Sequence, residues 1–115
     1  MEDELIELIS SSFNLPIFRQ GSLSEDEAYP EHFFTFWNVR SDGDGFYDND
    51  EHCINHVYNL NFYSIDPART YSALNEAKKI LKQHGWIAFG AGHDVASDEP
   101  THTGRGIDIV YKQLL

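Results

Sequence analysis

The chain has 115 residues, which is enough for one compact domain and too few for two of ordinary size, so a single domain over residues 1–115 is expected. A hydrophobic fraction of 41% and an aromatic fraction of 14% predict a packed core and exclude a disordered chain. The formal net charge of −11, with only 8 Lys and Arg, argues against wrapping nucleic acid or reading its sequence, because phosphate contacts need clustered basic residues.

The first segment, residues 2–13, has the spacing of an amphipathic helix. Its acidic residues crowd the first turn, where carboxylates favour the helix dipole. Its apolar stripe consists of Leu5, Leu8, Ile9 and Phe13. An acidic start is the opposite of a signal peptide, and no apolar run approaches the roughly 20 residues that cross a bilayer, so we expect a cytoplasmic protein with no membrane partner. A short extended piece, from Ile17 to about Gly21, and a polar loop follow.

Two strong strands come next in the chain. His32–Arg40 and Cys53–Ser64 both alternate with the period of two that is typical of strands. The first strand carries aromatic residues on both faces, so one face is expected to meet helices and the other, which includes Trp37, a loop or a neighbouring subunit. The eleven residues between the strands, SDGDGFYDNDE, predict a hairpin loop. The expected core set of the second strand is Ile54, His56, Tyr58, Leu60 and Phe62.

A second helix is expected after Ser64 or Asp66, either of which can cap it, with Pro67 in its first turn and a stop at Gly85. Its expected buried stripe is Tyr71, Leu74, Ala77, Ile80 and Leu81. A short strand over residues 86–89 then precedes two glycines. These elements together predict an α+β fold, with a mainly antiparallel sheet of about four strands and two helices packed on one face.

The stretch over residues 93–111 changes character along its length. Residues 94–103 are polar, acidic and interrupted by a proline, so they are expected on a surface or against a partner. The remainder alternates as a half-buried strand. Gly104 and Gly106 bracket Arg105 where loop becomes strand, which suits either a bulge or a close backbone approach.

Arg105 is expected to bind a carboxylate, because it is one of only 8 basic residues in a chain with 19 acidic ones. A partner in the same loop, Asp94, Asp98 or Glu99, would fix the loop on its own subunit. A carboxylate of a neighbouring subunit would instead join two subunits. Lys cannot match the two hydrogen bonds of a guanidinium, so Arg105→Lys is expected to weaken assembly or docking while the subunit stays folded, and Arg105→Ala to do so more severely.

The six histidines make a metal site the first chemistry to consider. None of them has the HExxH spacing of a zinc protease. His52 and His56 are four apart in a predicted strand, which separates them by roughly 13 Å. His93, Asp94 and His102 share a loop and would bind a cation, with help from Asp98, only if that loop brought them together. No metal or other cofactor is therefore expected.

The acidic run of the hairpin loop also fails as a binding motif. It places aromatic residues at positions 5 and 6 of an EF-hand loop, where an oxygen donor and a glycine are required. Cys53 is the only cysteine, is expected to be buried in a strand, and is not placed as a nucleophile. The sequence contains neither a GxSxG elbow nor a phosphate-binding GKS or GKT, so no catalytic residue is expected.

Five motifs carry a family resemblance: FFTFWN at 33–38, FYDNDE at 46–51, NFYSIDP at 61–67, AKKILKQHGW at 77–86 and DVASDEPTHTGRGI at 94–107. Over nearly its whole length the chain resembles tail completion, or tail terminator, proteins of long-tailed phages and prophages of Gram-positive bacteria. The resemblance implies a small α+β subunit that forms a ring of six, caps the tail tube and meets the head-side connector. It implies no catalytic residues, and a location in the host cytoplasm during assembly and in the virion afterwards.

Two other functions are compatible with the residues alone. An acidic chain can imitate DNA and occupy a host nuclease or regulator, and scattered His and Asp would suit a small metal-dependent hydrolase. In a ring of six the formal charge would be 6 × −11 = −66, and an acidic lumen would repel passing DNA. The candidate residues for assembly interfaces are Trp37, Asp42, Asp44, Asp48, Asp50, Asp98, Glu99, His102 and Arg105.

Overall fold

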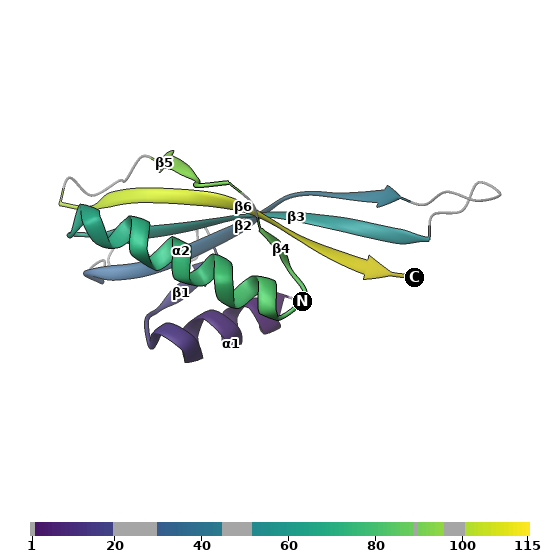
Figure 1. Ribbon diagram of the computed structural model, residues 1–115, viewed down its shortest axis with the longest axis horizontal. Coiled ribbons are helices and arrows are strands. Elements are labelled where there is room, and N and C mark those ends of the chain that lie inside the picture. The colour runs from purple at the N-terminus through teal and green to yellow at the C-terminus, as the bar shows by residue number, and fades with distance from the viewer. Residues whose placement is uncertain (1, 20–29, 45–51, 89, 96–100) are drawn as a thin grey trace.

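The computed structural model describes residues 2–19, 30–44, 52–88, 90–95 and 101–115. Two helices lie on one face of a six-stranded sheet, and none of the described residues forms a helix on the other face (Figure 1). The elements in chain order are α1 (Glu2–Phe13), β1 (Ile17–Arg19), β2 (His32–Asp44), β3 (Cys53–Ser64), α2 (Pro67–Gln83), β4 (Ile87–Ala88), β5 (His93–Val95) and β6 (Thr103–Leu114).

The sheet has the strand order β1-β2-β3-β6-β4, and β5 pairs with the same outer edge of β6 as β4 does. Every pair is antiparallel except β1 with β2, which is parallel. The predicted α+β class is confirmed, but the sheet has six strands where about four were expected. The difference lies in strands of two or three residues, whose pairing depends on partners far away in the sequence.

The core fills the space between the helices and the covered face of the sheet. α1 contributes Leu5 and Ile9, which are fully buried, and α2 contributes a stripe that ends at Leu81. The residues of the sheet that face them are Phe34, Phe36, Tyr58, Leu60, Phe62, Ala88, Ile107 and Ile109. The strong alternation of the long strands therefore identified the covered face correctly.

Both helices end as their sequences predict. Asn14 takes a left-handed conformation, with φ of 54°, and its N–H donates to Ser10 O, which stops α1. Asp66 caps α2 by accepting from the Ala68 N–H at 3.1 Å, and Gly85, with φ of 86°, reverses the chain after it. Tyr71 was wrongly predicted to be buried: its side chain is 53% exposed, because it lies at the flank of α2 beside Arg105.

Three strands continue past the helices as a projecting arm, formed by Ser41–Asp44, Cys53–His56 and Lys112–Leu114 (Figure 1). The predicted hairpin loop is therefore shorter than expected, because its first four residues belong to β2. His56 was expected in the core, as was Ile54, but both are only half-buried because no helix covers the arm. The His56 ring instead joins Ser41 Oγ and Gln113 Oε1, each at 2.8 Å.

The glycines of β6 let side chains of the neighbouring strands pack closely against its backbone, and they do not form a bulge. β6 pairs with β3 without interruption from Thr103 to Leu114. A Cβ on Gly106 would lie 2.1 Å from Asn61 Oδ1, and one on Gly104 would lie 2.6 Å from the Tyr63 ring. Of the two predicted alternatives, the close approach is correct. The irregularity of the sheet lies in β2, where the register shifts between Asn38 and Arg40.

Candidate functional site

The predicted site residues lie in three separate regions of the structure. Arg105 lies beside α2 on the covered side of the sheet, Trp37 lies on the opposite face, and Asp42 lies in the arm. Asp44 ends β2, next to the arm's tip. Asp48, Asp50, Asp98 and Glu99 lie outside the described residues. The structure therefore does not gather the predicted residues into one site.

Arg105 holds the segment that connects β4 to β5. Its Nη1 donates to Asp94 Oδ1 at 2.8 Å, and its Nη2 donates to the carbonyls of Ala91 and Gly92 at 3.0 and 3.2 Å. Its Cζ lies 4.3 Å from the centroid of the Tyr71 ring. Asp94, one of the three partners considered within the same loop, is thus the observed partner.

The Arg105 ion pair is asymmetric in its burial. The Arg105 side chain is 13% exposed, whereas that of Asp94 is 78% exposed. Within the described part of the chain, the buried Nε of Arg105 has no acceptor. Because this guanidinium already binds its own chain and is largely covered, it serves to lock the turn before β5, and joining subunits through Arg105 is not what this geometry favours.

A small aromatic group lies on the other face of the sheet, near the start of β2. The rings of Phe33 and Tyr63 stack at 5.2 Å, and Phe18 and His102 meet Phe33 edge-on at 6.1 and 5.9 Å. His102 Nε2 donates to Pro30 O at 2.7 Å, which leaves Nδ1 to accept from the Thr101 hydroxyl. His102 is therefore held as part of this packing.

The metal reading finds no support in this arrangement. Asp94 Oδ1 is bound to Arg105, and His102 Nε2 donates to Pro30 O, so the two residues have separate partners. No group of three or more His, Cys, Asp or Glu that could hold a metal ion occurs among the residues that the structure describes. Asp98, the fourth residue of that hypothesis, lies outside them.

The charged side chains described at the start of the arm are exposed to solvent. Asp42 Oδ2 lies 2.7 Å from Arg40 Nε, and both side chains are about 60% exposed, at 59% and 62%. Exposed pairs of this kind contribute little to stability, because water screens them. Cys53, by contrast, is buried at the start of β3, where it pairs with Asp44 and Leu114, and its burial agrees with the strand pattern.

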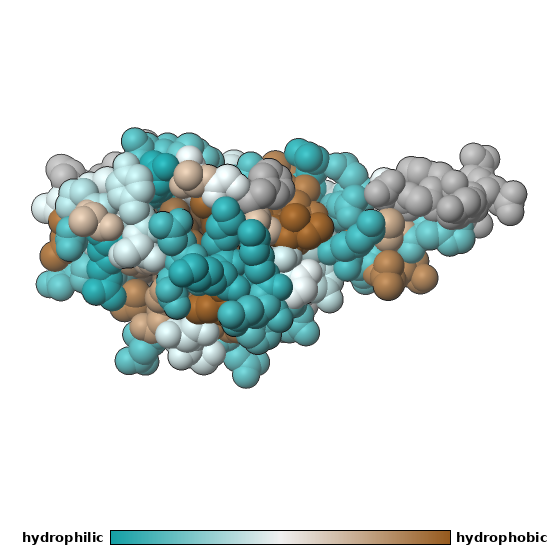
Figure 2. Space-filling view, in the orientation of Figure 1, coloured by the Kyte–Doolittle hydropathy of each residue, from teal (hydrophilic) through white to brown (hydrophobic). Residues whose placement is uncertain are grey.

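An apolar surface that the helices do not cover, the open-face patch, is formed by Trp37, Val57, Ile87 and Val110. Val57, Val110 and Ile87 are direct neighbours across β3, β6 and β4, and side chains of paired residues share a face. Trp37 lies on β2 in the next row of the same face, opposite Asn59, which is two residues from Val57 along β3. The side chains of Trp37 and Ile87 are each 50% exposed. Figure 2 shows apolar atoms gathered where β4 meets β6, and again at the end of β6.

A polar border accompanies the open-face patch. Asn59, the partner of Trp37 across β2 and β3, donates from Nδ2 to Asp108 Oδ1 at 2.6 Å, in the row next to that of Val57. Val39, the extra residue at the register shift, is also exposed. Sequence reasoning singled out Trp37 but missed Val57, Ile87 and Val110. Their apolar character was visible, but their alignment depends on the register of four strands.

Comparisons with known proteins add nothing to this description. No protein-family model matches the chain, and no curated protein matches it either. Among the described residues, none of the helices has both the length and the apolar character needed to span a membrane.

Proposed function

We propose that this chain is a self-assembling structural subunit that forms a ring of six at the head–tail junction of a long-tailed phage, as a tail terminator or tail completion protein. The observation that carries the proposal is the open-face patch, in which Trp37 and Ile87 are half exposed and Val57 and Val110 are partly exposed. Contiguous apolar surface that no element of the same chain covers marks interaction sites in soluble proteins.

The composition of the patch supports a protein partner. A tryptophan and three aliphatic residues lie in two adjacent rows of the sheet, and interface cores are enriched in aromatic residues. Among the residues that the structure describes, no helix lies on the sheet face that carries the patch, so a flat partner can approach it. A second copy of the chain is the partner that ring assembly requires.

The shape and the charge fit the same role. The molecule extends over 53 × 28 × 24 Å, and the arm carries part of that length beyond the helices. An arm of this kind is suited to reach a neighbouring subunit or the tail tube. The net charge of −11 per chain would make the lumen of a ring acidic, which would keep passing DNA from adhering. The family resemblance is the reason for assigning such a ring to the head–tail junction of a phage.

Electron microscopy of phage particles made without this protein tests the proposal. We expect overlong tails or tails that are not joined to heads, with complementation by the wild-type gene as the control. Heads that leak DNA would instead assign the subunit to head-side closure. Particles of normal length and joining, with loss of inhibition of a host nuclease, would replace the proposal with that of an acidic DNA mimic.

A further inference from the structure

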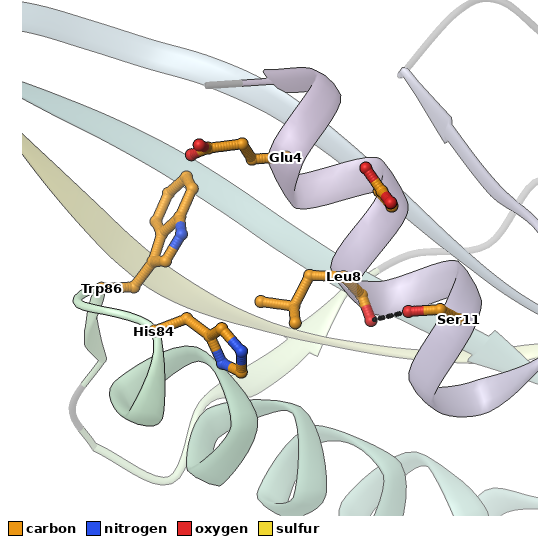
Figure 3. Close-up of a pocket in the computed structure, with 6 residues that line it drawn as sticks. Glu4, Leu8, Ser11, His84 and Trp86 are labelled. Atoms are coloured by element: carbon orange, nitrogen blue, oxygen red, sulfur yellow. Dashed lines mark hydrogen bonds between the residues drawn. The ribbon is translucent and has the colours of Figure 1, made fainter.

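A cavity of about 320 Å³ opens between α1 and the end of α2, on the side of the sheet away from the open-face patch (Figure 3). Its volume is at the small end of the range for ligand pockets. The residues that line it are Glu4, Glu7, Leu8, Ser11, His84 and Trp86. It uses none of the residues described above, so what it binds is independent of ring formation.

The wall of this cavity is formed by a rigidly held tryptophan. Gly85 reverses the chain after α2, and the Trp86 N–H donates to Leu81 O at 3.0 Å. The indole meets the rings of Tyr58 and Tyr111, with centroids 6.0 and 5.2 Å away, and the residue is only 4% exposed. Its orientation is therefore fixed by packing and not by the solvent.

The indole nitrogen of Trp86 is a donor without an acceptor. It lies on the edge of the ring that faces Leu8 across the cavity (Figure 3). In the described part of the chain no oxygen is hydrogen-bonded to it. The N–H opens into the cavity from an otherwise buried residue, so it is positioned to donate to an acceptor that enters.

The opposite wall offers carboxylates that are not neutralised. Glu2 binds Arg19 and accepts from the Tyr58 hydroxyl, and burial together with the Glu2 carboxylate raises the pKa of that hydroxyl. Glu4 and Glu7, one turn apart on α1, form no ion pair with any described residue. No lysine or arginine lines the cavity. The pocket therefore favours a cation.

His84 completes the set of acceptors. Its Nδ1 donates to Ile80 O at 2.9 Å, so the neutral ring presents Nε2 as an acceptor. A ligand that fits all of these groups carries an ammonium or guanidinium for the acids and a carbonyl oxygen for the indole. A lysine or arginine residue within a peptide has both, whereas a simple alkylamine has only the cation.

We propose that this pocket binds a basic side chain of a partner protein, with its cation held by Glu4 and Glu7 and its own peptide carbonyl accepting from the Trp86 indole. The occupant is thus a basic protein segment, and charge complementarity selects it in a chain with 19 acidic residues. Charge-assisted hydrogen bonds to the two acids supply the affinity, and the indole supplies the preference for peptide over free amine.

Titration of the labelled protein with N-acetyl-lysine-N-methylamide tests the pocket by NMR. The chain has two indole N–H signals, and Trp37→Phe assigns them. We expect the Trp86 signal to move downfield and saturate in the millimolar range while the Trp37 signal stays in place. N-acetyl-norleucine-N-methylamide, which lacks the charge, should move neither signal, and butylamine, which lacks the carbonyl, should bind without the downfield shift.

Three variants distinguish binding in this pocket from nonspecific electrostatic attraction to the acidic surface. Glu4→Gln or Glu7→Gln should weaken binding about tenfold, whereas Asp3→Asn, which removes the same charge from the same helix outside the cavity, should change it less than twofold. Equal losses in all three would overturn the proposal, as would an unmoved Trp86 signal or an equal response to norleucine. A butylamine titration identical to that of the lysine derivative would assign the pocket to free amines and refute a protein occupant.

Discussion

At the scale of single residues, Arg105 and Asp94 show how differently the two members of one ion pair can be buried. The guanidinium is 13% exposed and binds three oxygens and the face of Tyr71, whereas Asp94 lies mostly in water. Removing the buried member leaves two carbonyls and a carboxylate without their donor. Removing the exposed member leaves a charge that still has the carbonyls and the ring.

Substitutions at the two ends of this ion pair should therefore have unequal costs. Arg105→Ala is expected to lower the free energy of unfolding by roughly 2–3 kcal/mol, since it removes several charge-assisted hydrogen bonds. Arg105→Lys should lose about half of that, because an ammonium cannot reach all three acceptors. Asp94→Asn should cost less than about 1 kcal/mol. Urea unfolding measures all three.

The same series decides between the two roles considered for Arg105. A loss of stability with unchanged self-association identifies the lock within the subunit. Unchanged unfolding together with reduced association would show that Arg105 acts between subunits, contrary to the geometry. The sequence offered Asp94 as one of three partners in the same loop, beside a carboxylate of a neighbouring subunit, and charge balance alone did not choose among them. It did not predict the contact with Tyr71, because that depends on how α2 packs over β6.

At the scale of elements, the arm shows where the alternation of a strand ceases to predict which side chains are buried. The alternation of Cys53–Ser64 predicted the strand and its core face, and both are correct from Tyr58 onward. Ile54 and His56 follow the same alternation but are half-buried, since the helices end before the arm begins. Of the short strands, β4 was predicted within residues 86–89, whereas β5 was expected as loop, because only its pairing with β6 makes it a strand.

The acidic run Asp42, Asp44, Asp48 and Asp50 should matter for assembly and not for folding. Replacing all four by Asn should change the free energy of unfolding by less than about 1 kcal/mol, because charges in a polar, turn-rich segment contribute little to stability. The yield of joined heads and tails should fall. A control replaces three exposed acids elsewhere, Asp3, Glu31 and Glu76, by their amides, which removes three negative charges. Equal yields from both variants would exclude a role for this acidic run.

At the scale of the whole molecule, the proposal of self-assembly rests mainly on the two faces of the sheet, one covered by helices and the other carrying the open-face patch. Composition and periodicity were sufficient to predict a single α+β domain with both helices on one side. They were not sufficient to predict which apolar residues remain in water, since that requires the register of β3, β6 and β4. Trp37 was found because aromatic residues alternate on both faces of one strand, a local signal that Val57, Val110 and Ile87 lack.

Sedimentation equilibrium of the wild type, Ile87→Ser and Ile65→Ser is the most direct test of self-assembly through the open-face patch. The two isoleucines are similarly exposed, at 50% and 46%, but only Ile87 belongs to the patch. We expect the wild type and Ile65→Ser to reach six times 13.2 kDa, about 79 kDa, and Ile87→Ser to remain near 13.2 kDa with unchanged unfolding. A wild type that stays at the monomer mass, or an Ile87→Ser that assembles as well as Ile65→Ser, would contradict the proposal.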